Sequence, residues 1–182
     1  MEKDKKIIKE KKAWVNKQIG AAVVLTTVVF ITIFYYSPVS VKGVNTTADR
    51  LVFTFRCLFV SSFSIIFGIH TVGSVRGSTK AIDPVNGGGE SLVEVPNRIL
   101  RNTVEQFFLH MIALLTLSSF LDEGSMKAIP ILTFIFILGR ILFYFGYTYD
   151  PIYRGLGFAS TFLPTMATYA YCSFCILQTL LM

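Results

Sequence analysis

The sequence has few charged residues for its length. Asp, Glu, Lys and Arg make up only 15% of the 182 residues, whereas hydrophobic residues make up 53% and phenylalanine alone occurs 17 times. Such a chain is too apolar to be an ordinary soluble domain. The composition therefore predicts an integral membrane protein.

The chain also lacks the signatures of several other classes of protein. The glycine run inside the 77–97 connection has no GK[ST] ending, so we expect a flexible linker there and not a phosphate-binding loop. No internal repeat is visible, which disfavours a secondary transporter. Basic residues outside the N-terminal segment are scattered or lie at helix ends, which argues against nucleic acid as a partner.

Only three cysteines are present, and two of them form a Cys172-x-x-Cys175 pair within an apolar run. A structural metal site needs further ligands, and no histidine or second cysteine pair accompanies this one. We therefore interpret these thiols as small packing residues inside the membrane and predict no metal site.

Apolar runs long enough to cross a bilayer occur five times. A membrane-spanning helix needs about 20 mainly apolar residues. The runs are 18–36, 51–75, 99–121, 127–147 and 156–181. We therefore expect an all-α integral membrane protein with five transmembrane helices.

Lysines are concentrated ahead of the first run. The segment 1–17 holds seven lysines, whereas the loop 37–50 holds only Lys42 and Arg50 as basic residues. Positive charge beside a span favours the cytosolic side. The sequence thus predicts a basic cytosolic tail, an N-terminal helix at 18–36 and then a luminal loop. The tail also suits anionic membrane lipid, although its role as a topology signal explains the charge equally well.

Polar side chains recur on one face at the start of the third run. Arg98, Arg101, Asn102 and Glu105 are spaced i, i+3, i+4 and i+7, which places them on one side of a helix. The predicted topology puts this polar stripe at the cytosolic end of that helix.

A second polar stripe lies at the end of the fourth run. Arg140, Tyr144 and Tyr147 recur at i, i+4 and i+7, and Arg154 follows in the short turn before the last run. Each arginine taken alone is explained as a topology anchor, and each tyrosine as part of an aromatic belt. Those explanations do not account for Asn102, so we expect the two stripes to form a site.

The ligand of such a site would carry several charges. Arginine forks bind carboxylates, a glutamate suits an ammonium group, and a further arginine or tyrosine would hold a thiolate. Glutathione, a zwitterion with two carboxylates, fits this description. The residues alone leave open an acidic lipid headgroup, a nucleotide or a structural ion-pair network. The predicted binding residues are Arg98, Arg101, Asn102, Glu105, Arg140, Tyr144 and Tyr147.

Residues 51–182 resemble the MAPEG family, the membrane-associated proteins of eicosanoid and glutathione metabolism. The residues that carry the resemblance are Arg98-x-x-Arg101-Asn102-x-x-Glu105, and Gly139-Arg140 … Gly146-Tyr147 followed by Arg154. The resemblance implies a four-helix bundle that assembles as a homotrimer, here preceded by one extra N-terminal helix. It also implies an endomembrane location, such as the endoplasmic reticulum or Golgi, and a glutathione cleft between subunits near the cytosolic face.

The same resemblance implies a role for individual residues. Arg98, Asn102 and Glu105 would bind the polar groups of the tripeptide, Tyr147 would line the site, and Arg154 would be the catalytic residue that stabilises the thiolate. A nearby guanidinium lowers the pKa of a thiol, which is about 8.5 for cysteine. The thiolate would then conjugate or reduce a lipophilic electrophile that arrives from the membrane.

Two residues depart from the family pattern. Phe143 stands where active members have tyrosine or histidine, and Gly155 stands where some members supply a serine hydroxyl. Both departures bear on catalysis more than on glutathione binding.

Within the family the chain is most similar to the mattrin-like branch. This similarity lies in 102–107, 127–130, 154–158 and 161–164. It implies an alternative function, a non-catalytic membrane protein that regulates secretory or receptor trafficking, including restraint of Wnt receptors, with a receptor or cargo protein as partner. A channel or transporter is a third hypothesis, disfavoured because the polar groups gather at one interface.

Overall fold

The computed structural model describes residues 2–36 and 41–181. Residues 1, 37–40 and 182 lie outside the described part, and with them the start of the loop expected at 37–50 and the outermost residues of the 1–17 tail and of the 51–182 domain. The described residues form helices and turns and contain no strand.

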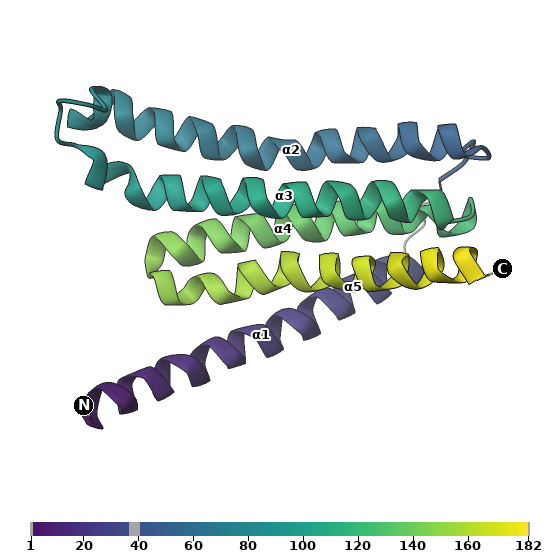
Figure 1. The fold of residues 1–182 in the computed structure, drawn as a ribbon, viewed down its shortest axis with the longest axis horizontal. Helices are drawn as coiled ribbons and strands as arrows, with labels where there is room; N and C mark the ends of the chain where they lie inside the picture. The colour runs from purple at the N-terminus through teal and green to yellow at the C-terminus, as the bar shows by residue number, and fades with distance from the viewer. Residues whose placement is uncertain (1, 37–40, 182) are drawn as a thin grey trace.

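Five long helices make up the described chain. They are α1 (Glu2–Tyr36), α2 (Thr47–Gly77), α3 (Glu94–Phe120), α4 (Ala128–Tyr149) and α5 (Arg154–Leu181). Helices α2 to α5 run side by side with alternating direction, whereas α1 packs obliquely on α4 and α5 with its N-terminal end apart from the bundle (Figure 1). The expected all-α fold of five helices is confirmed.

Four of the described helices, α1 to α4, are long and apolar enough to cross a membrane. The chain is therefore an integral membrane protein. Helix α5 has 28 residues, which is long enough to cross a hydrocarbon core of roughly 30 Å. Its first half, however, is rich in glycine, serine and threonine, which lower its hydropathy. The fifth crossing stays a prediction.

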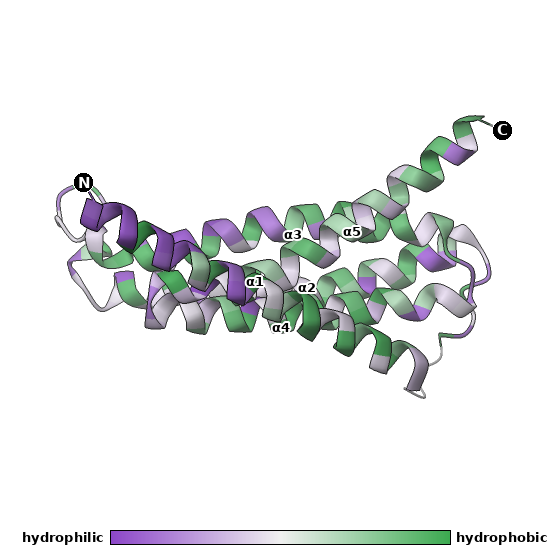
Figure 2. Ribbon diagram, turned by 90° about the horizontal axis from the view of Figure 1, so that it is seen from below, coloured by the Kyte–Doolittle hydropathy of each residue, from purple (hydrophilic) through white to green (hydrophobic). Residues whose placement is uncertain are grey.

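Helix α1 joins the basic tail and the first apolar run into one continuous helix of 35 residues. Hydrophilic residues predominate along its N-terminal part and hydrophobic residues along the rest (Figure 2). The boundary expected between residues 17 and 18 is therefore a change of surface chemistry along an unbroken backbone.

The connection between α2 and α3 is folded, which corrects the expectation of a flexible linker at 77–97. It contains two short 3-10 helices, η1 (Lys80–Ile82) and η2 (Glu90–Val93). Arg76, in the last turn of α2, donates to the carbonyl oxygen of Ala81 at 2.9 Å and to both carboxylate oxygens of Glu90 at 2.7 and 3.0 Å. This bidentate contact closes the connection onto the end of α2.

Local contacts complete the same connection. The Asp83 carboxylate accepts hydrogen bonds from the backbone N–H groups of Asn86 (2.9 Å) and Val85 (3.0 Å), and these bonds hold the pKa of Asp83 below its usual value. A Cβ atom at Gly89 would lie 2.3 Å from the backbone nitrogen of Ala81. The glycine run therefore allows a tight turn to form.

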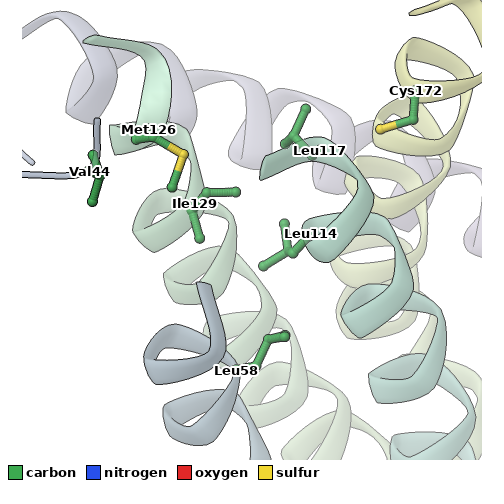
Figure 3. Packing of buried hydrophobic residues seen from close by; sticks show 7 residues of the cluster. All are labelled: Val44, Leu58, Leu114, Leu117, Met126, Ile129 and Cys172. Atoms are coloured by element: carbon green, nitrogen blue, oxygen red, sulfur yellow. The ribbon is translucent and has the colours of Figure 1, made fainter. Parts of the chain in front are cut away.

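The main hydrophobic core lies at the end of the bundle opposite the two polar stripes. Its buried members are Val44, Leu58, Leu114, Leu117, Met126, Ile129 and Cys172. They come from α2 to α5 and from the segments before α2 and α4 (Figure 3). Cys172 is buried in this core, and all three cysteines are free thiols.

Candidate functional site

Five of the predicted site residues line one cavity of about 580 Å³, which we call the arginine cavity. Arg98, Arg101 and Asn102 come from the first turns of α3, Tyr147 from the end of α4 and Arg154 from the start of α5. The described lining contains three guanidinium groups and no carboxylate, so the cavity favours an anionic ligand. The remaining lining residues are Val15, Ile19, Phe143, Pro151, Ile152, Gly155 and Phe158.

A tight turn between α4 and α5 places Arg154 in this cavity. Asp150 directly follows α4, and its carboxylate accepts a hydrogen bond from the N–H of Ile152 at 2.9 Å, which caps the 3-10 helix η4 (Pro151–Tyr153). Arg154 then donates from Nη1 to the hydroxyl oxygen of Tyr147 at 3.3 Å, and its guanidinium carbon lies 5.3 Å from the centre of that ring. The phenol therefore holds the guanidinium against the wall of the cavity.

Arg98 is shared between the cavity and a carboxylate on its own helix. It donates from Nη2 to Glu94, one turn earlier, and the two side chains are 52% and 55% exposed. An ion pair so exposed contributes little to stability. Because a guanidinium has five N–H donors, Arg98 keeps donors for a ligand in the cavity.

Arg140 lies behind the cavity and is only 4% exposed. It donates from Nη1 to the Asn102 side-chain oxygen at 2.9 Å, and from Nη2 to the Thr161 hydroxyl and to the Gly157 carbonyl oxygen, the latter at 3.4 Å. One buried guanidinium thus connects α3 with α5 through neutral acceptors. Because Asn102 lines the cavity, Arg140 positions a lining residue and is not itself part of that lining.

The structure does not bring Tyr144 and Glu105 into the arginine cavity. Tyr144 lines a separate cavity of about 580 Å³ between α2, α3 and α4, the α2 cavity, and its ring packs edge-on against Phe67 with 5.0 Å between centroids. Arg140 also borders the α2 cavity. Glu105 is exposed and lies outside the lining of both cavities. The polar stripe of α4 is therefore divided between the arginine cavity, which Tyr147 lines, and the α2 cavity, which Arg140 and Tyr144 line.

Helix α1 closes one side of the arginine cavity, which the sequence did not indicate. Val15 and Ile19 contribute to the lining. Between them Gln18, 8% exposed, donates from Nε2 to the carbonyl oxygen of Ile152 at 2.9 Å and accepts at Oε1 from the N–H of Leu156 at 3.1 Å. The Gln18 carboxamide thus holds α1 against the turn that carries Arg154, the predicted catalytic residue.

Gly155 leaves room for this contact. A Cβ atom at Gly155 would lie 3.1 Å from the Gln18 Oε1 atom, which is tighter than an ordinary contact. The glycine that departs from the expected family pattern therefore coincides with a polar side chain supplied by α1. The signal in the sequence was a single glutamine at the start of an apolar run, with Val15 and Ile19 at helical spacing beside it.

Replacing Gln18 with leucine is expected to loosen α1 from the α4–α5 turn. The change leaves the part-buried Ile152 carbonyl and Leu156 N–H without their partner, and the loss should be roughly 1 kcal/mol for each hydrogen bond because water can still reach these groups. Trp14, the single tryptophan of the chain, reports this directly because its ring lies 5.5 Å from that of Tyr153. We expect a red-shifted Trp14 emission and stronger quenching by acrylamide.

The control for this measurement is Gln178→Leu, the same replacement at an exposed position of α5. It should leave the Trp14 emission unchanged. An unchanged spectrum in Gln18→Leu would contradict the docking of α1 through Gln18.

The sequence profile of the MAPEG family matches residues 19–174, a range that begins inside α1, ahead of residue 51, and ends inside α5. No solved structure matches the chain.

Two relatives share a name. Transmembrane protein 79 of Bos taurus is 28% identical over 149 residues, and Transmembrane protein 79 of Mus musculus is 28% identical over 151 residues. The two alignments cover 82% and 81% of this chain but only 38% of each relative. The chain therefore spans well under half the length of the curated relatives that it matches. The predicted similarity to the mattrin-like branch is confirmed, since mattrin is another name of that protein.

Proposed function

Because this chain belongs to the MAPEG family, we propose that its arginine cavity binds glutathione. Many members of the family bind this tripeptide. The observation that carries the proposal is the convergence of Arg98, Arg101 and Arg154 on one cavity with no carboxylate in its described lining. Among the described residues only Arg98 of these three pairs with a carboxylate, Glu94, whereas a structural ion-pair network would place acidic side chains against all of them.

The number of cationic groups matches the ligand. Glutathione has two carboxylates, one ammonium group and one thiol. In this proposal Arg98 and Arg101 bind the carboxylates, since guanidinium forks suit that geometry. The Asn102 amide nitrogen donates to a peptide carbonyl, because Arg140 already occupies the amide oxygen. Glu94 is the carboxylate in contact with a lining residue, and it accepts from the ammonium group.

Arg154 is the proposed catalytic residue. A guanidinium beside the thiol favours the thiolate and lowers the thiol pKa. The thiolate adds to a lipophilic α,β-unsaturated carbonyl compound from the bilayer, which forms one C–S bond and moves an electron pair toward the carbonyl oxygen. The resulting enolate takes a proton from water. This addition needs no hydroxyl group at Phe143 or Gly155, so both departures from the family pattern are compatible with it.

The test is a calorimetric titration of reduced glutathione into the purified full-length protein in nanodiscs. We expect saturable binding, and at least a roughly tenfold weaker affinity in Arg154→Ala, equivalent to about 1.4 kcal/mol. S-methylglutathione, which cannot form a thiolate, should bind the wild-type protein more weakly and should be less affected by Arg154→Ala.

Arg56→Ala is the matched control, because Arg56 is an exposed arginine on α2 outside the cavity lining. It removes one positive charge and should leave the affinity unchanged. Absence of binding at millimolar glutathione would overturn the proposal, as would an equal loss in both arginine variants.

A second candidate function is a non-catalytic regulator of secretory or receptor trafficking. It is favoured by the similarity to Transmembrane protein 79 and by Phe143, which is 2% exposed and offers no hydroxyl to the arginine cavity. Under this function a membrane receptor or cargo protein is the partner, and Arg154→Ala leaves trafficking unchanged. Proximity labelling from the membrane-embedded chain would identify that partner.

The proposed assembly and location follow from the family and from charge. We propose a homotrimer in an endomembrane with the N-terminus in the cytosol, because the lysines of α1 lie at its N-terminal end. Cross-linking in native membranes and protease protection of an N-terminal tag test these two statements separately.

A further inference from the structure

An apolar cavity of about 460 Å³ lies between α1 and the bundle, toward the opposite end from the arginine cavity. Residues of α1, the end of α3, the first half of α4 and the middle of α5 line it. Three of them, Val23, Ile31 and Tyr171, are 45%, 47% and 47% exposed. The cavity therefore opens outward between helices, and because α1, α3 and α4 are candidate membrane spans, the opening faces lipid.

The lining of the apolar cavity is mainly hydrocarbon. Its described lining contains no Asp, Glu, Lys, Arg or His. The Thr26 hydroxyl donates to the carbonyl oxygen of Ala22 at 2.8 Å, and the Thr168 hydroxyl donates to that of Pro164 at 2.9 Å. These two hydroxyl donors are thus engaged within their own helices, and the hydroxyl groups of Thr27 and Tyr171 are the other polar side-chain groups of the lining, so water in the cavity would have few partners. An alkyl chain has no polar group that would lose hydrogen bonds on entering the cavity.

A cation stands at one end of the apolar cavity. Lys127 ends the 3-10 helix η3 (Gly124–Lys127), directly before Ala128, which lines the cavity. Its ammonium lies 4.3 Å from the ring centre of Phe34, one turn of α1 beyond the lining residue Phe30. Among the described residues it contacts no carboxylate. Because α4 begins here, Lys127 lies at headgroup depth, and the cavity lies beneath it.

We propose that the apolar cavity holds one acyl chain of an anionic phospholipid whose phosphate is bound by Lys127. Along the membrane normal, the Lys127 ammonium lies outside the hydrocarbon wall of the cavity, just as the headgroup of a phospholipid lies outside its acyl chains. The lipid would fill the wedge between α1 and α5 and so would brace α1 in the position that closes the arginine cavity. The proposal stands whether or not that cavity binds glutathione.

The test uses phosphatidylglycerol with a photoreactive diazirine in its acyl chain, incorporated into phosphatidylcholine nanodiscs that hold the full-length protein. After irradiation, mass spectrometry should find the label on the α1 and α5 peptides that line the cavity. A phosphatidylcholine probe with the same diazirine chain should label these peptides less. Ala167→Trp, which fills the cavity from an exposed position of α5, should reduce the label by roughly tenfold.

Matched variants distinguish the contribution of the acyl chain to lipid binding from that of the headgroup. Ala170→Trp, exposed on α5 but outside the lining, should leave the label unchanged. Lys127→Gln should remove the preference for phosphatidylglycerol, whereas Lys42→Gln, an exposed loop lysine, should not. Thr27→Trp, on the facing wall, replaces Ala167→Trp if that variant does not fold.

Two outcomes would overturn the proposal. One is a label spread evenly over all helices and insensitive to the tryptophan that fills the cavity. The other is equal labelling by the two probes in the wild-type protein.

Discussion

Replacing Gly157 with alanine should abolish the folded protein. The added Cβ atom would lie 2.1 Å from the backbone nitrogen of Phe143, 2.4 Å from its Cα and 2.7 Å from the carbonyl oxygen of Gly139. All three are backbone atoms, so no side chain can rotate away, and α4 and α5 must separate. The cost should exceed the roughly 1–3 kcal/mol that overpacking typically causes, because separation also breaks the contacts of Arg140 with Gly157 and Thr161.

Size-exclusion chromatography in mild detergent and thermal unfolding measure this effect. Gly157→Ala should elute as aggregate or unfold far below the wild-type midpoint. Gly73→Ala is the control, because a Cβ atom there has no neighbour within 4 Å, and alanine is the better helix former. A Gly157→Ala protein that unfolds like the control would show that α4 and α5 do not meet at this glycine.

Replacing Arg140 with alanine should have the second largest effect. The Asn102 side-chain oxygen, the Gly157 carbonyl and the Thr161 hydroxyl each lose a donor, at roughly 1–3 kcal/mol for each buried group that stays unsatisfied. The guanidinium volume is also lost between α3 and α5. Arg140→Lys should fall between alanine and the wild type, because a single ammonium group lacks the planar fork that reaches acceptors on two helices.

The unfolding midpoints of Arg140→Ala, Arg140→Lys and Arg56→Ala provide the comparison. Arg56 is exposed on α2, and its replacement should change the midpoint little. If Arg140→Ala and Arg56→Ala unfold at the same temperature, the buried guanidinium network does not hold α3 to α5.

Helical periodicity predicted part of the candidate site. It placed Arg98, Arg101 and Asn102 on one face of α3, and the structure brings these three into one cavity with Tyr147 and Arg154. Periodicity gives the direction of a side chain about its own helix, but not the helix that it meets. Arg140 shares a stripe with Tyr147, yet its longer side chain extends into the interior between α3 and α5.

Contacts between distant segments account for what the sequence did not predict. Gln18 contacts residues 134 and 138 positions further along the chain. The local sequence marks Gln18 as a polar residue in an apolar run, but it does not identify these partners. The apolar part of α1 is hydrophobic around most of its circumference, so no periodic signal marks the face that packs on α5. The 77–97 connection has the composition of a linker, yet the ion pair between Arg76 and Glu90, 14 residues apart, and the local hydrogen bonds of Asp83 fold it.

Helix α1 is continuous across the boundary between its charged and its apolar part. Gln18 binds the helix to the α4–α5 turn and separates a lysine-bearing arm at 2–17 from an apolar arm at 19–36. Because the two arms belong to one continuous helix, we expect attraction of the lysine arm to an anionic membrane surface to change how the apolar arm packs on α5. The surface charge of the membrane and the width of the apolar cavity would then be thermodynamically linked, and such a linkage is reciprocal.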